Sequence, residues 1–137
     1  MSFIAAYQAI MDRFVTQWTA LQPTVRVAYP NMAFTPTPGT AWVRVTVVPD
    51  PNSRQAAIGK TRLWRNRGLV IVQVFTPQGA GDEAALTLGD SVTAAMRGVT
   101  ISGLRLKATS LLRVGNDQQW LQYNADTPYE YDDVTTA

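Results

Sequence analysis

The residues best placed to do chemistry are charged, and they fall into two separate groups. The basic group lies within fourteen positions that contain no acidic residue, and it consists of Arg54, Lys60, Arg62, Arg65 and Arg67. The acidic group lies near the C-terminus and consists of Asp126, Glu130, Asp132 and Asp133. Segments of opposite charge could join identical subunits head to tail, because a heterologous contact needs two complementary patches on each subunit.

Two other interpretations of the basic group stay open. Arginine and lysine neutralise DNA phosphates, and Trp64 among the arginines could stack on a base. The segment could also be a solvated hairpin without a partner. The nine charged residues are therefore predicted as subunit or DNA contacts, with the partner left open.

Residue types that commonly perform catalysis are scarce in this chain. It contains no Cys and no His, which excludes thiol nucleophiles and thiolate metal sites and removes the commonest general base. The C-terminal acids lack the regular spacing and the glycine turn of a calcium loop. We therefore predict that the protein is not an enzyme and that it uses no metal or cofactor.

Two short stretches resemble nucleotide-binding motifs only weakly. Gly79 to Ala84 fits the pattern G-x-G-x-x-A, but Asp82 and Glu83 would repel a pyrophosphate at the start of the following helix. The run Gly59-Lys60-Thr61 resembles the end of a P-loop, but the first glycine of that motif is replaced by Arg54. Both stretches are interpreted as ordinary loops.

Composition indicates one globular domain that has protein partners. The chain has 137 residues, of which 46% are hydrophobic and only 16% are charged, with a net charge of +2. Soluble domains usually carry about 25% charged residues, so part of this surface is expected to be covered by partners. No apolar run approaches the roughly 20 residues of a membrane span, and no signal peptide is evident. We expect a protein that works inside a cell and has no membrane contact.

Hydrophobic periodicity predicts an α+β domain spanning 1–137, with a mostly antiparallel sheet and two main helices packed against it. The predicted helices span 3–21 and 82–97, and the predicted strands span 25–29, 42–48, 57–64, 69–75, 103–108, 110–115 and 119–125. Asp82 is the expected N-cap of the second helix and Gly98 its stop. Residues 65–68 are expected to be the turn of a hairpin, and 132–137 a frayed end.

The same patterns predict a core and a protruding segment. The residues expected to be largely buried in one cluster are Phe14, Trp18, Val45, Ile71, Val72, Val74 and Leu88. The basic segment 53–67 has few apolar anchors, so we expect a mobile or protruding loop-hairpin there.

The C-terminal segment carries a resemblance to a known family. Residues 114–132 read VGNDQQWLQYNADTPYEYD, in which a glycine turn leads to an aromatic-rich strand and a finish of Pro, aromatic and acidic residues. This ending resembles the tail-terminator, or tail-completion, proteins of long-tailed bacteriophages and prophages. The opening helix with Phe14 and Trp18, and the run Tyr29-Pro30-Asn31, are similar to that family as well.

The resemblance implies a structural role in the virion tail. It implies a ring, usually a hexamer, that caps the tail tube, ends its polymerisation and presents a surface to the head-tail connector protein. The implied partners are further copies of the chain, the tail-tube protein, the connector and the DNA that passes through the lumen. Assembly would take place in the cytoplasm of the bacterial host. Two other functions stay open, which are a nucleic-acid-binding module and another head–tail joining protein, such as a stopper or minor tail protein.

Overall fold

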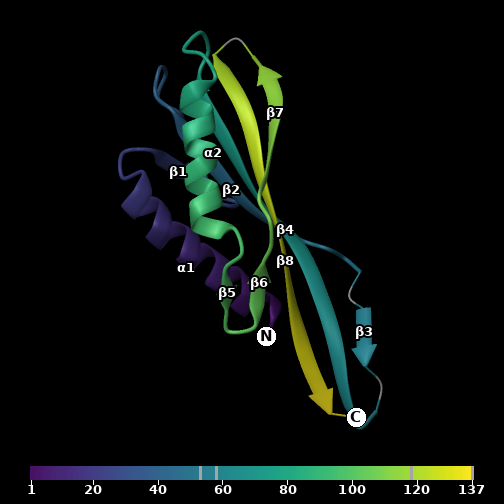
Figure 1. The fold of residues 1–137 in the computed structure, drawn as a ribbon. Coiled ribbons are helices and arrows are strands. Elements are labelled where there is room, and N and C mark those ends of the chain that lie inside the picture. Colours follow the sequence, from purple (N-terminus) through teal and green to yellow (C-terminus); the bar gives the residue numbers. More distant parts are fainter. Residues whose placement is uncertain (53, 58, 118, 137) are drawn as a thin grey trace.

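Two helices cover one face of a long, mostly antiparallel sheet, as the computed structural model in Figure 1 shows. The structure describes residues 1–52, 54–57, 59–117 and 119–136. Within them the elements are α1 (Phe3–Leu21), β1 (Arg26–Ala28), β2 (Trp42–Pro49), β3 (Arg54–Ala57), β4 (Thr61–Pro77), α2 (Glu83–Met96), β5 (Thr100–Ile101), β6 (Leu104–Leu106), β7 (Ser110–Asn116) and β8 (Trp120–Thr136). The predicted α+β class is confirmed.

The sheet is organised around β4 and β8, which pair with each other along 17 residues each. The strand order is β1-β2-β4-β8-β6-β5, with β3 also paired to β4 and β7 also paired to β8. Only the β1–β2 pair is parallel among the described strands. The two long strands therefore connect every other part of the sheet.

The first helix begins and packs as its sequence predicts. The Ser2 hydroxyl accepts a hydrogen bond from the Ala5 N–H at 3.1 Å, which satisfies one of the free donors at the helix start. Ile10, Phe14 and Trp18 lie on one side at four-residue spacing and are buried against the sheet.

The second helix ends as expected but begins differently. Gly98 has φ +69°, the left-handed conformation that commonly follows a helix. Asp82 occupies the N-cap position, but its side chain makes no capping hydrogen bond. Its carboxylate instead accepts a hydrogen bond from the Tyr123 hydroxyl at 2.9 Å and lies 3.5 Å from Arg113 Nε. A cross-element contact has therefore replaced the predicted cap.

The core lies between the helices and the helix-covered face of the sheet. Of the seven predicted core residues, Phe14, Trp18, Val45, Val72, Val74 and Leu88 are buried. Ile71 is only half-buried and does not belong to the core cluster, so its predicted place in that cluster is wrong. Successive strand residues point to opposite faces, and the burial of Val70 and Val72 places Ile71 on the face without helices.

One end of the sheet continues past the helices as a β-ribbon, which we call the arm (Figure 1). It consists of β3, residues 61–68 of β4 and residues 129–136 of β8. The predicted turn at 65–68 is wrong, because these residues are paired with β8. The predicted frayed end is also wrong for 132–136, which pair with 61–65, while residue 137 lies outside the described residues. Mobility of the arm stays a prediction.

None of the described helices is long and apolar enough to cross a membrane.

Candidate interaction surface at the base of the arm

Six charged side chains form a network on the face of the sheet without helices. We call Arg65, Arg67, Arg105, Lys107, Glu130 and Asp132 the charge ladder. Arg65 is directly opposite Asp132 in the β4–β8 pairing, and Arg67 is opposite Glu130. Arg105 of β6 is opposite Glu130 from the other side. Paired residues share a face, while their neighbours Asn66 and Tyr131 are buried on the helix side.

Glu130 is the centre of the ladder. Its Oε1 accepts hydrogen bonds from Arg105 Nε at 3.2 Å and Nη2 at 3.0 Å. Its Oε2 lies 3.2 Å from Lys107 Nζ and 3.6 Å from Arg67 Nε. Burial alone would raise the pKa of Glu130, but hydrogen bonds from Lys107 and Arg105 outweigh it, so that the pKa is lowered.

Asp132 is bound by two guanidinium groups. Arg65 donates to it from Nε at 2.9 Å and from Nη2 at 3.2 Å, which is the bidentate geometry that arginine makes with carboxylates. Arg105 Nη2 lies 3.5 Å from the same carboxylate. The hydrogen bonds from Arg65 are the main reason that the pKa of Asp132 is lowered.

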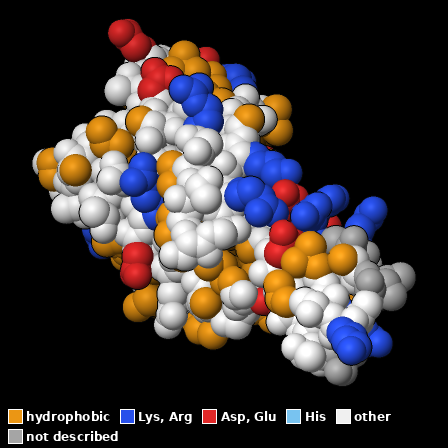
Figure 2. All heavy atoms as spheres, turned by 60° about the horizontal axis from the view of Figure 1, so that its bottom comes forward, with side chains coloured by type: hydrophobic (Ala, Val, Ile, Leu, Met, Phe, Trp, Pro, Cys, Tyr) orange, Lys and Arg blue, Asp and Glu red, His pale blue; other side chains and the backbone are white. Residues whose placement is uncertain are grey.

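The outward surface of the ladder is basic. The side chains of Glu130 and Asp132 are only 12% and 22% exposed, whereas the four cations are 35–51% exposed. Arg54 of β3 lies opposite Arg65 and has no ion pair among the described residues. Four cations therefore contact the two carboxylates, and Arg54 adds a fifth positive charge beside Arg65. Figure 2 shows blue side chains grouped with red ones at the base of the arm.

The other predicted contact residues lie outside the ladder. Lys60 precedes β4, and Arg62 points to the opposite face of the arm from Arg65 by strand alternation. Asp133 accepts from the Met1 amino group at 2.6 Å on the helix side. Asp126 lies farther along β8, and its Oδ1 is buried without a hydrogen-bond partner in the described part of the chain. Burial raises its pKa.

Two ion pairs therefore connect the predicted basic group with the predicted acidic group within the same chain. They are Arg65–Asp132 and Arg67–Glu130. Contacts of these residues with another subunit or with DNA stay a prediction. Sequence reasoning missed Arg105 and Lys107 as members of the site. Arg105 and Lys107 are two residues apart in the predicted strand 103–108, so strand alternation places both side chains on one face. The sequence does not show which residues of β8 lie opposite them.

A hollow of about 530 Å³ adjoins the ladder on the same side. Val48, Leu69 and Pro128 give it an apolar lining. The charged residues at its wall are Arg67, Lys107, Asp50 and Glu130. Apolar surface beside fixed guanidinium groups is typical of protein–protein interfaces, in which arginine is enriched. The site can therefore bind carboxylates and apolar side chains together.

The ladder makes stability depend on pH. Folding lowers the pKa of Glu130 and Asp132. Their ionised forms therefore stabilise the folded state when the pH is above the ordinary pKa of a carboxyl group. This stabilisation is lost as the pH falls below about 5 and through the lowered pKa values. We expect a Glu130→Gln/Asp132→Asn variant to melt below the wild type at pH 7, with the difference shrinking by pH 3. Thermal melts at both pH values test this, with exposed Asp12→Asn as the control. An unchanged difference between pH 7 and pH 3 would contradict it.

Comparisons with known proteins identify the family. The profile described as "Phage tail terminator protein" matches residues 5–112. One similar solved structure shares 23% sequence identity, with 96% of each chain covered and a TM-score of 0.72. Another, a chain from the virion of a native gene transfer agent (GTA) particle, shares 18% identity over 93% of this chain and 92% of that chain, with a TM-score of 0.55. Comparison with curated protein sequences gives no match.

Identities this low establish a shared fold alone, whereas the profile match covers most of the chain. The protein belongs to the phage tail terminator family, which consists of structural proteins of the virion tail.

Proposed function

We propose that this protein forms a ring, most simply a hexamer, that caps the tail tube. The ring ends tube polymerisation and then joins the tube to the head-tail connector, and DNA passes through its central hole. The observation that carries this proposal is the family match over residues 5–112. The site of action is the virion tail, with assembly in the cytoplasm of the bacterial host.

The subunit has features that suit such a ring. Its two layers differ, with helices on one face and bare sheet on the other, so that opposite sides offer different surfaces for a heterologous contact. Its 16% content of charged residues is low for a protein whose whole surface stays in water. These features support repeated contacts between identical subunits.

Assembly is expected to depend on the tube. Exposed ion pairs contribute little each and are screened by salt, so that apolar contacts must supply most of the affinity between subunits. We expect a monomer or weak oligomer in isolation and a closed ring on a tube end, where neighbouring binding sites hold the subunits side by side.

The test is assembly of the tail-tube protein with and without this protein. Tubes formed alone should grow to uncontrolled lengths, whereas tubes formed with it should be short and carry a ring at one end. Negative-stain electron microscopy gives both readouts. Binding along the sides of tubes, or tube lengths that do not change, would contradict a terminator role and favour another head–tail joining protein.

A further inference from the structure

An acidic surface lies on the outer side of α2, on the helix-covered face of the sheet. Glu83 and Asp90 are exposed, and neither has an ion pair among the described residues. They are seven residues apart, which is about two turns or roughly 10 Å along one side of a helix. Both carboxylates therefore project to the same side and are available to a partner.

Apolar side chains accompany these carboxylates. Leu86 is 44% exposed between them on α2, and Leu111 of β7 is 39% exposed. Leu111 packs directly against α2, because a Cβ at Gly89 would lie only 2.9 Å from its Cδ2. We call Glu83, Leu86, Asp90 and Leu111 the acidic helix face.

The charge ladder has the complementary composition. Its five cations, with Arg54 included, exceed its two carboxylates by three charges. Apolar cross-strand pairs flank it on both sides, namely Leu69–Pro128 and Leu63–Val134. Val134 is 62% exposed although it lies in a regular strand. The ladder thus offers excess positive charge between two apolar patches.

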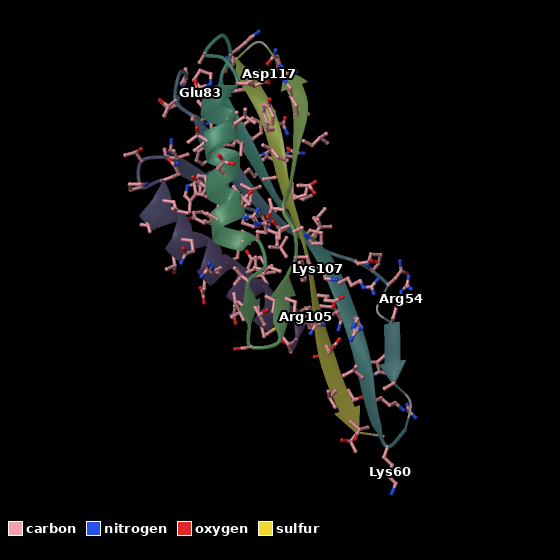
Figure 3. All side chains as sticks on the ribbon, viewed as in Figure 1. Arg54, Lys60, Glu83, Arg105, Lys107 and Asp117 are labelled. Atoms are coloured by element: carbon pink, nitrogen blue, oxygen red, sulfur yellow. The ribbon has the colours of Figure 1, made fainter. Side chains whose placement is uncertain are left out.

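The two surfaces cannot meet within one subunit. They lie on opposite faces of the sheet, since α2 packs on the buried face and the ladder alternates away from it. They are also separated along the length of the molecule. Figure 3 shows Glu83 at the end of α2 far from the arm, and Arg54, Arg105 and Lys107 beyond the other end of α2. Only two different subunits can bring them together.

We propose that the acidic helix face of one subunit docks on the charge ladder of the next. The proposal rests on the proposed ring and names the surfaces that join its subunits. Two unpaired carboxylates meet a surface with three excess positive charges, and Leu86 and Leu111 meet the apolar hollow beside Arg67. The contact is heterologous, so that repetition closes into a ring when the rotation between subunits permits it.

A protein partner fits the ladder better than DNA does. Phosphate backbones are bound by charge and hydrogen bonds and gain nothing from Leu63, Leu69 or Val134. A protein surface that has carboxylates beside leucine side chains can contact both the cations of the ladder and the apolar residues that flank it. DNA binding by the ladder is the competing outcome of the test below.

The test uses two charge-reversed variants that should fail separately and work together. Arg54→Glu/Arg67→Glu makes the ladder acidic, so that it repels the unchanged helix face. Glu83→Lys/Asp90→Lys makes the helix face basic, so that it repels the unchanged ladder. When the two variants are mixed, every ladder can meet a helix face of opposite charge in an alternating ring, which closes for an even number of subunits such as six.

The measurement is ring formation on tail tubes, by electron microscopy and by native mass spectrometry of released caps. Each variant alone should cap tubes at least tenfold less than the wild type, and the equimolar mixture should restore capping with both variants in each ring. Arg26→Glu/Arg44→Glu changes the net charge equally outside both surfaces and should cap normally. Rescue by mixing separates a lost contact from misfolding.

Cross-linking gives a second measurement that does not depend on charge reversal. The chain has no cysteine, so that Asp90→Cys/Lys107→Cys introduces the sole thiols. A short bismaleimide should then link the subunits of a ring on a tail tube into dimers and higher oligomers. The single variant Asp90→Cys should give at most background dimers.

The outcomes separate the two proposals. If the wild type forms no ring on tubes, the proposed function fails. If the wild type forms rings and both variants cap normally, or if the mixture gives no rescue and no cross-links form, these docking surfaces are wrong and the ring stands. If the ladder variant caps normally but loses affinity for a 30-base-pair DNA duplex, the nucleic-acid interpretation of the ladder replaces this one.

Discussion

Replacing Phe14 with alanine is expected to lower the free energy of unfolding by about 3–5 kcal/mol. Phe14 has no exposed surface and lies at the centre of the contact between α1 and the sheet. Its ring stacks on Trp18 with centroids 5.5 Å apart. Truncation removes the buried ring and leaves a cavity beside Trp18, because the rigid sheet cannot collapse into it.

Urea unfolding of purified wild type and variant measures this loss. The matched control is Val15→Ala on the next residue of the same helix, whose side chain is 38% exposed. It should change stability by less than about 1 kcal/mol. A loss at position 14 no larger than the loss at position 15 would show that α1 does not pack by the side that contains Phe14.

The elements that follow from local periodicity are the ones that the sequence predicts well. Helix α1 was predicted over 3–21 and spans those residues, because its apolar spacing and its cap are both properties of neighbouring residues. The strand at 42–48 is equally clear from the alternation of Val43, Val45 and Val47. Such signals need no knowledge of what lies across the fold.

The arm could not be predicted in the same way. Residues 65–68 read Arg-Asn-Arg-Gly, and the Asn and Gly in this run are typical of a turn. What holds them in a strand is β8, more than sixty residues farther along the chain, through pairs such as Arg65–Asp132. The supposed turn and the supposed frayed end stabilise each other, and neither pattern contains the register.

The candidate site shows the same division. The two charged groups were visible in the sequence, and so was the possibility that they attract each other. Their pairing within one chain depends on the register of β4 and β8, and the entry of Arg105 and Lys107 depends on that of β6. Glu130 and Asp132 are bound inside the subunit, so the partner of the excess cations must lie elsewhere. Glu83 and Asp90 on α2 are exposed carboxylates that have no ion pair among the described residues.

Gly68 leads to a prediction in which local propensity and packing have opposite signs. Valine favours strands and glycine weakens them. From strand propensity alone, Gly68→Val should therefore stabilise the protein, by less than about 1 kcal/mol. The structure places the Tyr129 ring where a Cβ at position 68 would lie. Tyr129 is 4% exposed and stacks on Tyr131 at 6.4 Å, which leaves the ring little room to move.

We therefore expect Gly68→Val to destabilise the protein by about 1–3 kcal/mol or more, the usual cost of forcing extra atoms into a packed site. The decisive control is the same substitution in a Tyr129→Ala background. There the ring is absent, and valine at 68 should become neutral or stabilising, because only its strand propensity remains. Urea unfolding of the four proteins gives the coupling between the two positions. If Gly68→Val stabilises the wild-type background, or if its effect is the same in both backgrounds, then Tyr129 does not cover Gly68 and the pairing of β4 with β8 at the base of the arm is wrong.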